Sequence, residues 1–196
     1  MMINSAREAA EILMRQDDIL ILTHANPDGD TLGCGYALCR ALLSLGKKAK
    51  VSCSDEIPPK YSYLSAGIEE TEFEPKFIVA VDVADTKLLG KKNEELYCDK
   101  IDLCIDHHGS NRLFAKETLL NAKAAAAYEI ILETVKALGA EVTQEIADCI
   151  YTGLSTDTGC FRYSNVTPVT MRMAADMIEA GARHSMINTV MFETKT

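Results

Sequence analysis

Short runs of apolar residues recur along the chain and predict the strands of a buried sheet. Residues 19–22 are continuously apolar, which is typical of a parallel strand that is covered on both faces. Residues 77–81 form a similar run, and the mainly apolar segments 49–53 and 101–105 also predict strands, which makes three further strands. Because helical patterns separate these runs, we expect βαβ units and an α/β fold, with a mainly parallel β-sheet flanked by helices on both faces.

Apolar residues three and four positions apart predict the helices between the strands. Ser5 to Glu8 has the capping-box pattern, so a first helix is expected to begin there and to end near Gln16. A second helix is expected from about Thr31 to Gly46, a glycine that suits a helix C-terminus. The other expected helices cover residues 124–138, 144–154, 168–180 and about 184 to the end of the chain. Residues 54–76 are expected to form either a connection over the sheet edge or one short helix around 61–66.

Composition and charge narrow the classes of protein that fit. No apolar stretch is long enough to span a bilayer, and residues 1–8 lack the zones of a signal peptide, so we expect a cytoplasmic protein that does not bind membranes. Seven cysteines without a Cys-x-x-Cys pair argue against a disulfide framework or a zinc knuckle. A net charge of −9 disfavours binding of duplex DNA through a broad basic surface.

Acidic and imidazole side chains follow three of the predicted strands, at the point where each apolar run stops. His24 follows the first strand, Asp82 the third, and Asp106, His107 and His108 the fourth. The carboxyl ends of parallel strands lie on one edge of an open sheet, and ligands bind there. We therefore expect these segments to converge on one site.

The segment from His24 to Asp30 is expected to be one tight loop, in which Asp28 is a further carboxylate. Pro27 would fix its backbone, and Gly29 would permit a turn conformation that other residues resist. Carboxylates beside imidazoles favour Mn²⁺, with Mg²⁺, Co²⁺, Fe²⁺ and Zn²⁺ as alternatives. The number of acidic groups favours two divalent cations, which together can activate a water molecule for attack on a phosphoester.

A purely structural role of these residues is the alternative. An aspartate after a strand often caps the next helix, and a histidine there can serve only as a hydrogen-bonding group. So many like charges at one sheet edge would repel one another without counter-cations, and the metal site is therefore favoured.

Four segments, in this order, resemble the signature motifs of the DHH phosphoesterase superfamily. The segments are His24 to Asp30 with Gly33 following, Val81 to Asp85, Asp106 to His108, and Thr156 to Gly159. Residues 151–165 are especially similar to the branch that includes the bifunctional oligoribonucleases (nanoRNases) and phosphatases of 3′-phosphoadenosine 5′-phosphate (pAp). The resemblance extends from about residue 18 to 190.

The resemblance implies a set of metal ligands, namely His24, Asp28, Asp30, Asp82, His107 and Asp157. One metal would be held by His24 and Asp28, the other by Asp30, His107 and Asp157, and Asp82 would bridge the two. The resemblance also implies that His108 faces the substrate phosphate or assists the leaving oxygen. Asp106 would orient the imidazoles. Arg162 is a further candidate for a phosphate contact, and a surface ion pair is its alternative role.

Other residues near the motifs are expected to be structural. Asp85 would orient a neighbour or cap a helix, Gly33 would allow close helix packing, and His184 would lie on the surface. Glu129 would form a hydrogen bond near the site or face solvent. The sequence departs from the family at Cys34, where a small hydroxyl residue is common, and at Cys160, where a basic residue is usual.

By this resemblance residues 1–180 form the DHH catalytic domain, and 181–196 form a final helix leading toward a C-terminal substrate-binding domain that is absent from this chain. The implied function is hydrolysis of short oligoribonucleotides or pAp by a water that two metals activate. The expected partner is a small nucleotide or a short single-stranded oligonucleotide, and a homodimer is left open. Pyrophosphate, cyclic dinucleotides and single-stranded DNA are alternative substrates, and a catalytically weak metal-binding module is the alternative class.

Overall fold

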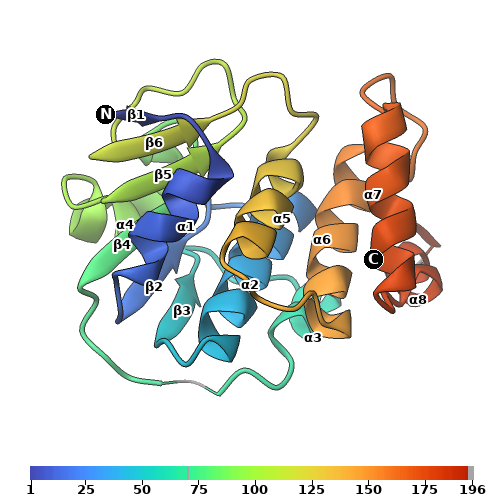
Figure 1. Cartoon of the computed structure of the whole chain (residues 1–196), viewed down its shortest axis with the longest axis horizontal. Helices are drawn as coiled ribbons and strands as arrows, with labels where there is room; N and C mark the ends of the chain where they lie inside the picture. The colour runs from blue at the N-terminus through green and yellow to red at the C-terminus, as the bar shows by residue number, and fades with distance from the viewer. Residues whose placement is uncertain (70, 194–196) are drawn as a thin grey trace.

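The sheet of the computed structural model, which describes residues 1–69 and 71–193, has six strands that all pair in parallel (Figure 1). Their order across the sheet is β1-β6-β5-β4-β2-β3. The strands are β1 (Met2–Ile3), β2 (Ile19–Leu22), β3 (Ala49–Ser52), β4 (Phe77–Val81), β5 (Leu103–Asp106) and β6 (Glu117–Leu120). The predicted α/β class with a parallel sheet is therefore confirmed.

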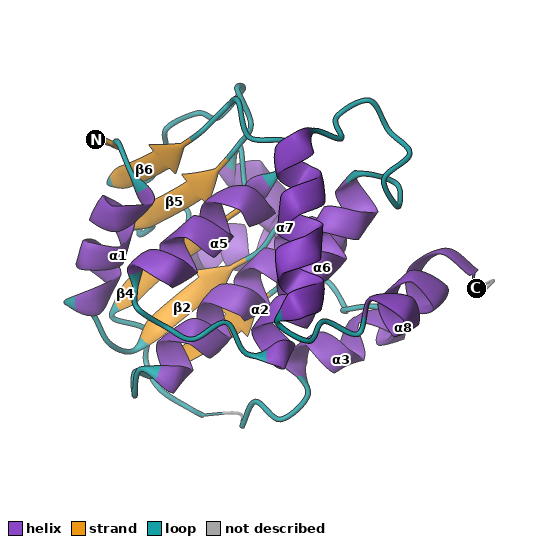
Figure 2. Cartoon of the chain, turned by 45° about the vertical axis from the view of Figure 1, so that its right-hand side comes forward, coloured by secondary structure: helices purple, strands orange, loops and turns teal. Residues whose placement is uncertain are grey.

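Helices connect the strands and cover the two faces of the sheet unequally. The helices are α1 (Ala6–Met14), α2 (Gly29–Ser44), α3 (Ser62–Ser65), α4 (Gly90–Tyr97), α5 (Ala127–Ala137), α6 (Gln144–Asp157), α7 (Pro168–Glu179) and α8 (His184–Asn188). Two 3₁₀ turns, η1 (Pro59–Tyr61) and η2 (Thr86–Leu89), and a π-helical turn, η3 (Thr189–Glu193), complete the described elements. Figures 1 and 2 show α1, α5 and α2 lying over one face, with α6, α7 and α8 farther out.

Side-chain alternation along the strands divides the core into two parts. Ile19 and Ile21 of β2 belong to the large cluster under α1, α2 and α5, whereas Leu20 and Leu22 belong to a smaller cluster with Leu89 of η2. All four residues of β2 are buried, as expected for a parallel strand covered on both sides. Apolar burial on both faces thus holds the strand ends in fixed register.

The structure contains elements that the sequence pattern did not locate. Strand β1 has 2 residues, which is too short for a periodic signal, and β6 begins with the polar residues Glu117 and Thr118, so it has no continuous apolar run. Helix α4 is rich in charged residues and has one buried side chain, Asn93, so its apolar face is weak. Its place beside the sheet follows from contacts distant in sequence.

The boundaries of two helices differ from the prediction at the ends that bear the motifs. Helix α2 begins at Gly29 rather than Thr31, because the Asp28 side chain caps it. Helix α6 continues past residue 154 to Asp157. The helix expected from residue 184 onward is observed as α8 and η3, and residues 194–196 of that prediction lie outside the described residues.

Helices α2 and α6 approach closely, and Gly33 makes the approach possible. A Cβ atom at Gly33 would lie 2.4 Å from the backbone oxygen of Cys149 on α6. Such a contact is far below van der Waals distance, so only glycine fits without moving the backbone. The prediction that Gly33 permits close helix packing is confirmed.

Among the helices of the described residues, none combines the length and apolar character that crossing a membrane requires.

Candidate metal centre

A cavity of about 410 Å³ lies at the carboxyl ends of the central strands. Its lining residues are His24, Ala25, Asn26, Asp28, Asp82, Leu88, His107, His108 and Asp157. The segments that follow β2, β4 and β5 therefore converge, together with the end of α6.

Asp82, directly after β4, lines this cavity and has its backbone in the left-handed region, at φ 58°. The backbone N–H of Asp82 donates to the Ile105 carbonyl at 2.9 Å, which fixes this uncommon conformation. Asp82 is 4% exposed, and its Oδ1 atom has no hydrogen-bond partner among the described residues. Burial, followed by the charges of Asp30 and Asp28, raises the pKa of Asp82 well above its usual value.

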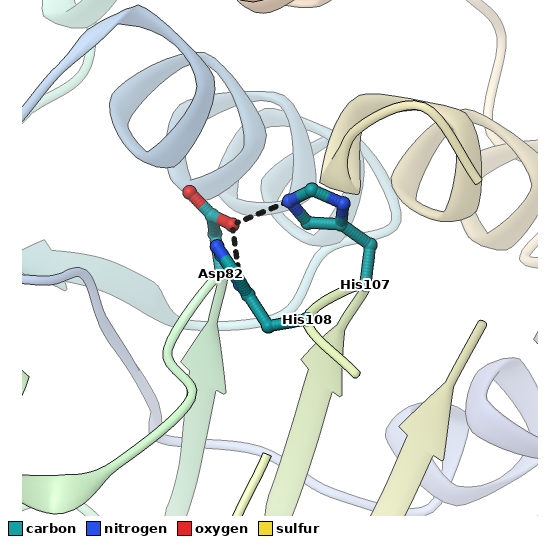
Figure 3. Close-up of side chains that lie close together, drawn as sticks. All are labelled: Asp82, His107 and His108. Atoms are coloured by element: carbon teal, nitrogen blue, oxygen red, sulfur yellow. Dashed lines mark ion pairs between the residues drawn. The ribbon is translucent and has the colours of Figure 1, made fainter. Parts of the chain in front are cut away.

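Each carboxylate oxygen of Asp82 faces an imidazole. Oδ2 lies 3.7 Å from Nε2 of His24, and Oδ1 lies 3.6 Å from Nε2 of His107 and 3.6 Å from Nδ1 of His108 (Figure 3). These separations exceed hydrogen-bond distance and leave the carboxylate between imidazoles, which are side chains that can bind metal ions.

Asp28 divides its two oxygens between the fold and the cavity. Oδ1 accepts from the backbone N–H groups of Asp30 and Thr31 at 3.0 and 3.1 Å and so caps α2, while Oδ2 lies 3.7 Å from His24 Nε2. Burial opposes ionisation of Asp28, yet the contacts with His24 and the cap hold its pKa below the usual value. The structural role as a helix cap and the role as a metal ligand were weighed as alternatives, but the Asp28 side chain can fill both.

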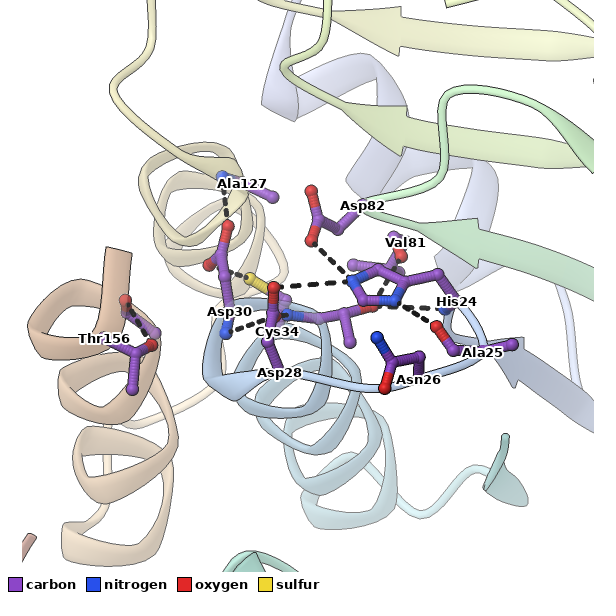
Figure 4. A network of polar contacts seen from close by, with 12 residues as sticks. His24, Ala25, Asn26, Asp28, Asp30, Cys34, Val81, Asp82, Ala127 and Thr156 are labelled. Atoms are coloured by element: carbon purple, nitrogen blue, oxygen red, sulfur yellow. Dashed lines mark hydrogen bonds and ion pairs between the residues drawn. The ribbon is translucent and has the colours of Figure 1, made fainter. Parts of the chain in front are cut away.

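Asp30 lies in the first turn of α2, so the expectation that it belongs to a loop with Asp28 is wrong. It is 1% exposed, and its Oδ2 accepts from the Ala127 N–H at 2.8 Å. Its Oδ1 accepts from the Tyr128 N–H at 3.1 Å and from the Cys34 thiol at 3.2 Å (Figure 4). Asp30 therefore caps the N-terminus of α5 from a distant part of the chain, where Ala126 provides no side-chain cap.

The role expected for Gly29 is also wrong. Gly29 is not among the glycines with positive φ; it is the first residue of α2. A Cβ atom there would lie 2.3 Å from the Thr156 hydroxyl oxygen on α6. Glycine is required at this position by close approach of two helices, not by a turn conformation.

Asp157, the last residue of α6, comes close to Asp30 and His107. Burial and then the negative charges of Asp30 and Asp28 raise the pKa of Asp157 to about 8. Burial is likewise the main cause that raises the pKa of Asp30 to about 6, and the main cause that lowers the pKa of His107. In this pocket a proton or a cation must compensate the carboxylates.

Asp106 is fully buried and holds the segment that carries the two histidines. Its Oδ1 pairs with His108 Nδ1 at 2.7 Å and accepts from the His107 N–H at 2.8 Å. Its Oδ2 accepts from the Asn111 side-chain amide at 2.6 Å. His108 is therefore oriented by Asp106, whereas its 3.6 Å separation from Asp82 is too long for a hydrogen bond.

Three groups of ligand atoms in the cavity are suitable for divalent cations, the atoms of each lying within 4.8 Å of one another. The groups are His24, Asp28 and Asp82; Asp30, His107 and Asp157; and Asp82, His107 and His108. Asp82 belongs to two of them. The unpartnered buried oxygen of Asp82 and the mixture of carboxylates and imidazoles fit hard or borderline divalent ions.

The structure places the remaining candidates outside the cavity lining. Arg162 is exposed, and its Nε donates to the Gly159 carbonyl at 2.7 Å. Asp85 caps η2 through the N–H of Lys87, and His184 is exposed, as expected. Glu129 is half-buried in the first turn of α5, and burial raises its pKa.

Sequence reasoning missed two residues of the site. Asn111 supports Asp106, and Leu88 lines the cavity between polar groups. A buried aspartate needs donors, which is the one signal that could have pointed to an amide near Asp106. Leu88 carries no sequence signal, because its place depends on the fold.

A parallel α/β sheet with carboxylates and imidazoles gathered at its strand ends defines a class of candidate metal-binding α/β domains. Within this class the chain belongs to the DHH family: residues 18–154 match the DHH family, N-terminal domain. The resemblance inferred from the four motifs is thereby confirmed.

Curated relatives support the same assignment. The chain is 34% identical over 185 residues to the bifunctional oligoribonuclease and PAP phosphatase NrnA of Thermus thermophilus, covering 90% of this chain and 55% of that protein. It is 26% identical over 183 residues to the protein of the same name from Bacillus subtilis, covering 91% of this chain and 58% of that protein. The chain thus spans little more than half the length of these relatives.

Solved structures show the same fold. An exopolyphosphatase-related protein from Bacteroides fragilis matches with a TM-score of 0.86 and 21% identity, covering 97% of this chain and 61% of that one. A putative family II inorganic pyrophosphatase from Methanococcus jannaschii matches with a TM-score of 0.62 and 18% identity, covering 88% and 61%. At these identities the similarity concerns the fold alone.

Proposed function

We propose that this chain is the metal-binding part of a phosphoesterase that hydrolyses short oligoribonucleotides, pAp or both, using two divalent cations, with Mn²⁺ as the first choice. The observation that carries the proposal is the Asp82 carboxylate, which is buried, has one unpartnered oxygen and faces an imidazole with each oxygen. The names of the curated relatives, oligoribonuclease and PAP phosphatase, support the choice of substrates.

Two of the ligand groups would each hold one cation in this proposal. His24 and Asp28 would hold the first, and Asp30, His107 and Asp157 the second. Asp82 would bridge them, because its two oxygens face His24 and His107 respectively. The carboxyl groups whose pKa is raised would lose their protons when a cation binds. The affinity for the cations should therefore increase with pH.

Bound divalent cations supply Lewis acidity to phosphoryl oxygens and lower the pKa of water. The side chains of the protein would orient the substrate and move protons. With Nδ1 of His108 held by Asp106, its Nε2 remains available to exchange a proton with a substrate oxygen. Asn111, through Asp106, would keep the imidazole in that orientation.

The proposal is tested with protein that is stripped by chelator and reloaded with Mn²⁺. Release of mononucleotide from a diribonucleotide and of phosphate from pAp is measured, with inorganic pyrophosphate as the competing substrate. We expect product from the first two and two Mn²⁺ per chain by calorimetry. Preferred hydrolysis of pyrophosphate would replace the proposed substrate class.

Variants connect the activity to the site. Asp82→Asn should lose Mn²⁺ binding and activity together, while the exposed Asp99→Asn, which changes the same charge outside the cavity, should keep both. If the natural protein extends beyond residue 196, the assay is repeated on the longer protein. Two bound Mn²⁺ without turnover of any substrate in either protein would favour the metal-binding module.

A further inference from the structure

An apolar side chain stands in the metal cavity among charged and polar groups. Leu88 of η2 is 47% exposed and lines the cavity together with Ala25, while the rest of the lining consists of histidine, aspartate and asparagine side chains. Other exposed leucines, such as Leu96 at 48%, lie outside this cavity. The position of Leu88, rather than its exposure, therefore distinguishes it.

The backbone of Leu88 is fixed on both sides. Its carbonyl accepts from the Ala25 N–H at 2.7 Å, and its N–H donates to the Asp85 carbonyl at 2.9 Å. The next residue, Leu89, is fully buried in the smaller core. The Leu88 side chain is thus held beside the loop that carries His24 and Asp28.

The residue after Leu89 strengthens this arrangement. Gly90 has φ 75°, and a Cβ atom there would lie 2.7 Å from the Cβ atoms of both Ala25 and Ser54. The end of η2 is therefore pressed directly against the His24–Asp28 loop. Leu88 cannot move away from the cavity without disrupting these contacts.

The charged and the apolar parts of the lining suit different parts of a ligand. Cations held by the carboxylates and imidazoles would attract phosphoryl oxygens, but they offer nothing to an apolar group. A side chain such as Leu88 gains from covering apolar surface of a ligand, because both surfaces then leave water. Inorganic phosphate and pyrophosphate have no such surface, whereas a nucleoside has a base and a sugar.

We propose that Leu88 is a specificity-determining residue whose side chain packs against the nucleoside part of the substrate while the phosphate occupies the metal site. This inference rests on the proposed function, since it takes a nucleoside phosphate as the ligand. It adds the residue by which the cavity distinguishes organic from inorganic phosphates.

Binding to Mn²⁺-loaded protein tests the inference independently of turnover. The dissociation constants of AMP and of inorganic phosphate are measured by calorimetry for the wild type, Leu88→Ala, Leu88→Met and Leu96→Ala. Leu88→Ala should weaken AMP binding about tenfold, the lower range for loss of apolar contact in a pocket, and leave phosphate binding unchanged. Leu88→Met should restore AMP binding, and Leu96→Ala should match the wild type.

Each result bears on Leu88 alone. Equal weakening of AMP and phosphate in Leu88→Ala, or unchanged binding of both, would overturn the inference. The Mn²⁺ content of each variant is measured in parallel, and a loss of metal in Leu88→Ala would also overturn it, because the effect would then be on the cations. A chain that binds AMP through Leu88 but does not hydrolyse nucleotides would refute the proposed function and leave the inference standing.

Discussion

The buried and the open sides of the candidate metal centre hold their side chains in different ways. On the buried side, Asp30 and Asp106 are 1% and 0% exposed, and each accepts three hydrogen bonds or close polar contacts from the protein. On the open side, the side chains of Asp28 and His108 are 56% and 42% exposed. The buried carboxylates thus join distant elements, whereas Asp28 and His108 each use one atom for the fold and expose the rest of the side chain to the cavity.

This contrast predicts the largest effect for Asp30→Ala. The substitution removes a proposed metal ligand and leaves the N–H groups of Ala127 and Tyr128 without their acceptor at the start of α5. Each unpaired buried donor costs about 1–3 kcal/mol, so the free energy of unfolding should decrease by about 2–6 kcal/mol even in chelator. Urea denaturation measures this free energy. Unchanged stability would contradict the claim that the buried carboxylates stabilise the fold.

Asp28→Ala should affect the metal far more than the fold. The cap of α2 is lost at a cost of about 1 kcal/mol, but no buried charge or donor network is broken. Mn²⁺ affinity should fall by about 100-fold or more, above the range typical for groups that only orient a ligand. Calorimetry gives the affinity, and Asp99→Ala, which removes an exposed carboxylate outside the cavity, is the control.

Asn111→Ala tests whether the buried Asp106 orients the exposed His108. It removes the amide that holds Asp106 and, through it, His108. Turnover of the substrate should fall about 10-fold, with two Mn²⁺ still bound. Asn111→Asp, which replaces the donor by an acceptor, should be worse than Ala, and the opposite order would contradict the proposed orientation.

Within the interval from pH 7 to 9, the pH dependence of stability should give the smallest effect. In the folded protein Asp157 has a pKa raised to about 8 and Asp30 to about 6, mainly by burial, whereas the unfolded chain releases these protons near pH 4. Stability from these groups is complete below about pH 4 and is lost as pH rises through 6 and 8. Between pH 7 and 9 the Tm of chelated protein should therefore fall.

Mn²⁺ should reverse this slope, because cations bind the deprotonated carboxylates. Asp157→Asn in chelator is the matched control and should show a flatter curve over the same interval. Scanning calorimetry at several pH values measures both. A Tm of the chelated wild type that stays constant from pH 7 to 9 would show that the carboxylates remain charged without cations.

The features that could be predicted from the sequence are those determined by residues close together along the chain. The apolar runs of β2 and β4 and the helix-closing Gly46 could be predicted, because burial and φ are local demands. The convergence of His24, Asp82 and His107 could be predicted because these residues follow strand ends, whereas Asp157, at the end of α6, was implied only by the family resemblance. The donors that hold Asp30 lie almost a hundred residues away, at Ala127 and Tyr128, and the place of Leu88 depends on η2 docking against a loop, so neither left a periodic signal.

The contact at Gly33 has a consequence for how such chains diverge. Asp30 and Asp157 belong to the two helices that meet there, and the meeting leaves no space for a methyl group beside Cys149. Alanine at position 33 would push α2 and α6 apart, although it would not contact Asp30 or Asp157 itself. A related chain with this change could retain every aspartate and histidine of the motifs and still lack the arrangement of Asp30 and Asp157 that the proposed cation site requires, because of a residue that is not itself a ligand.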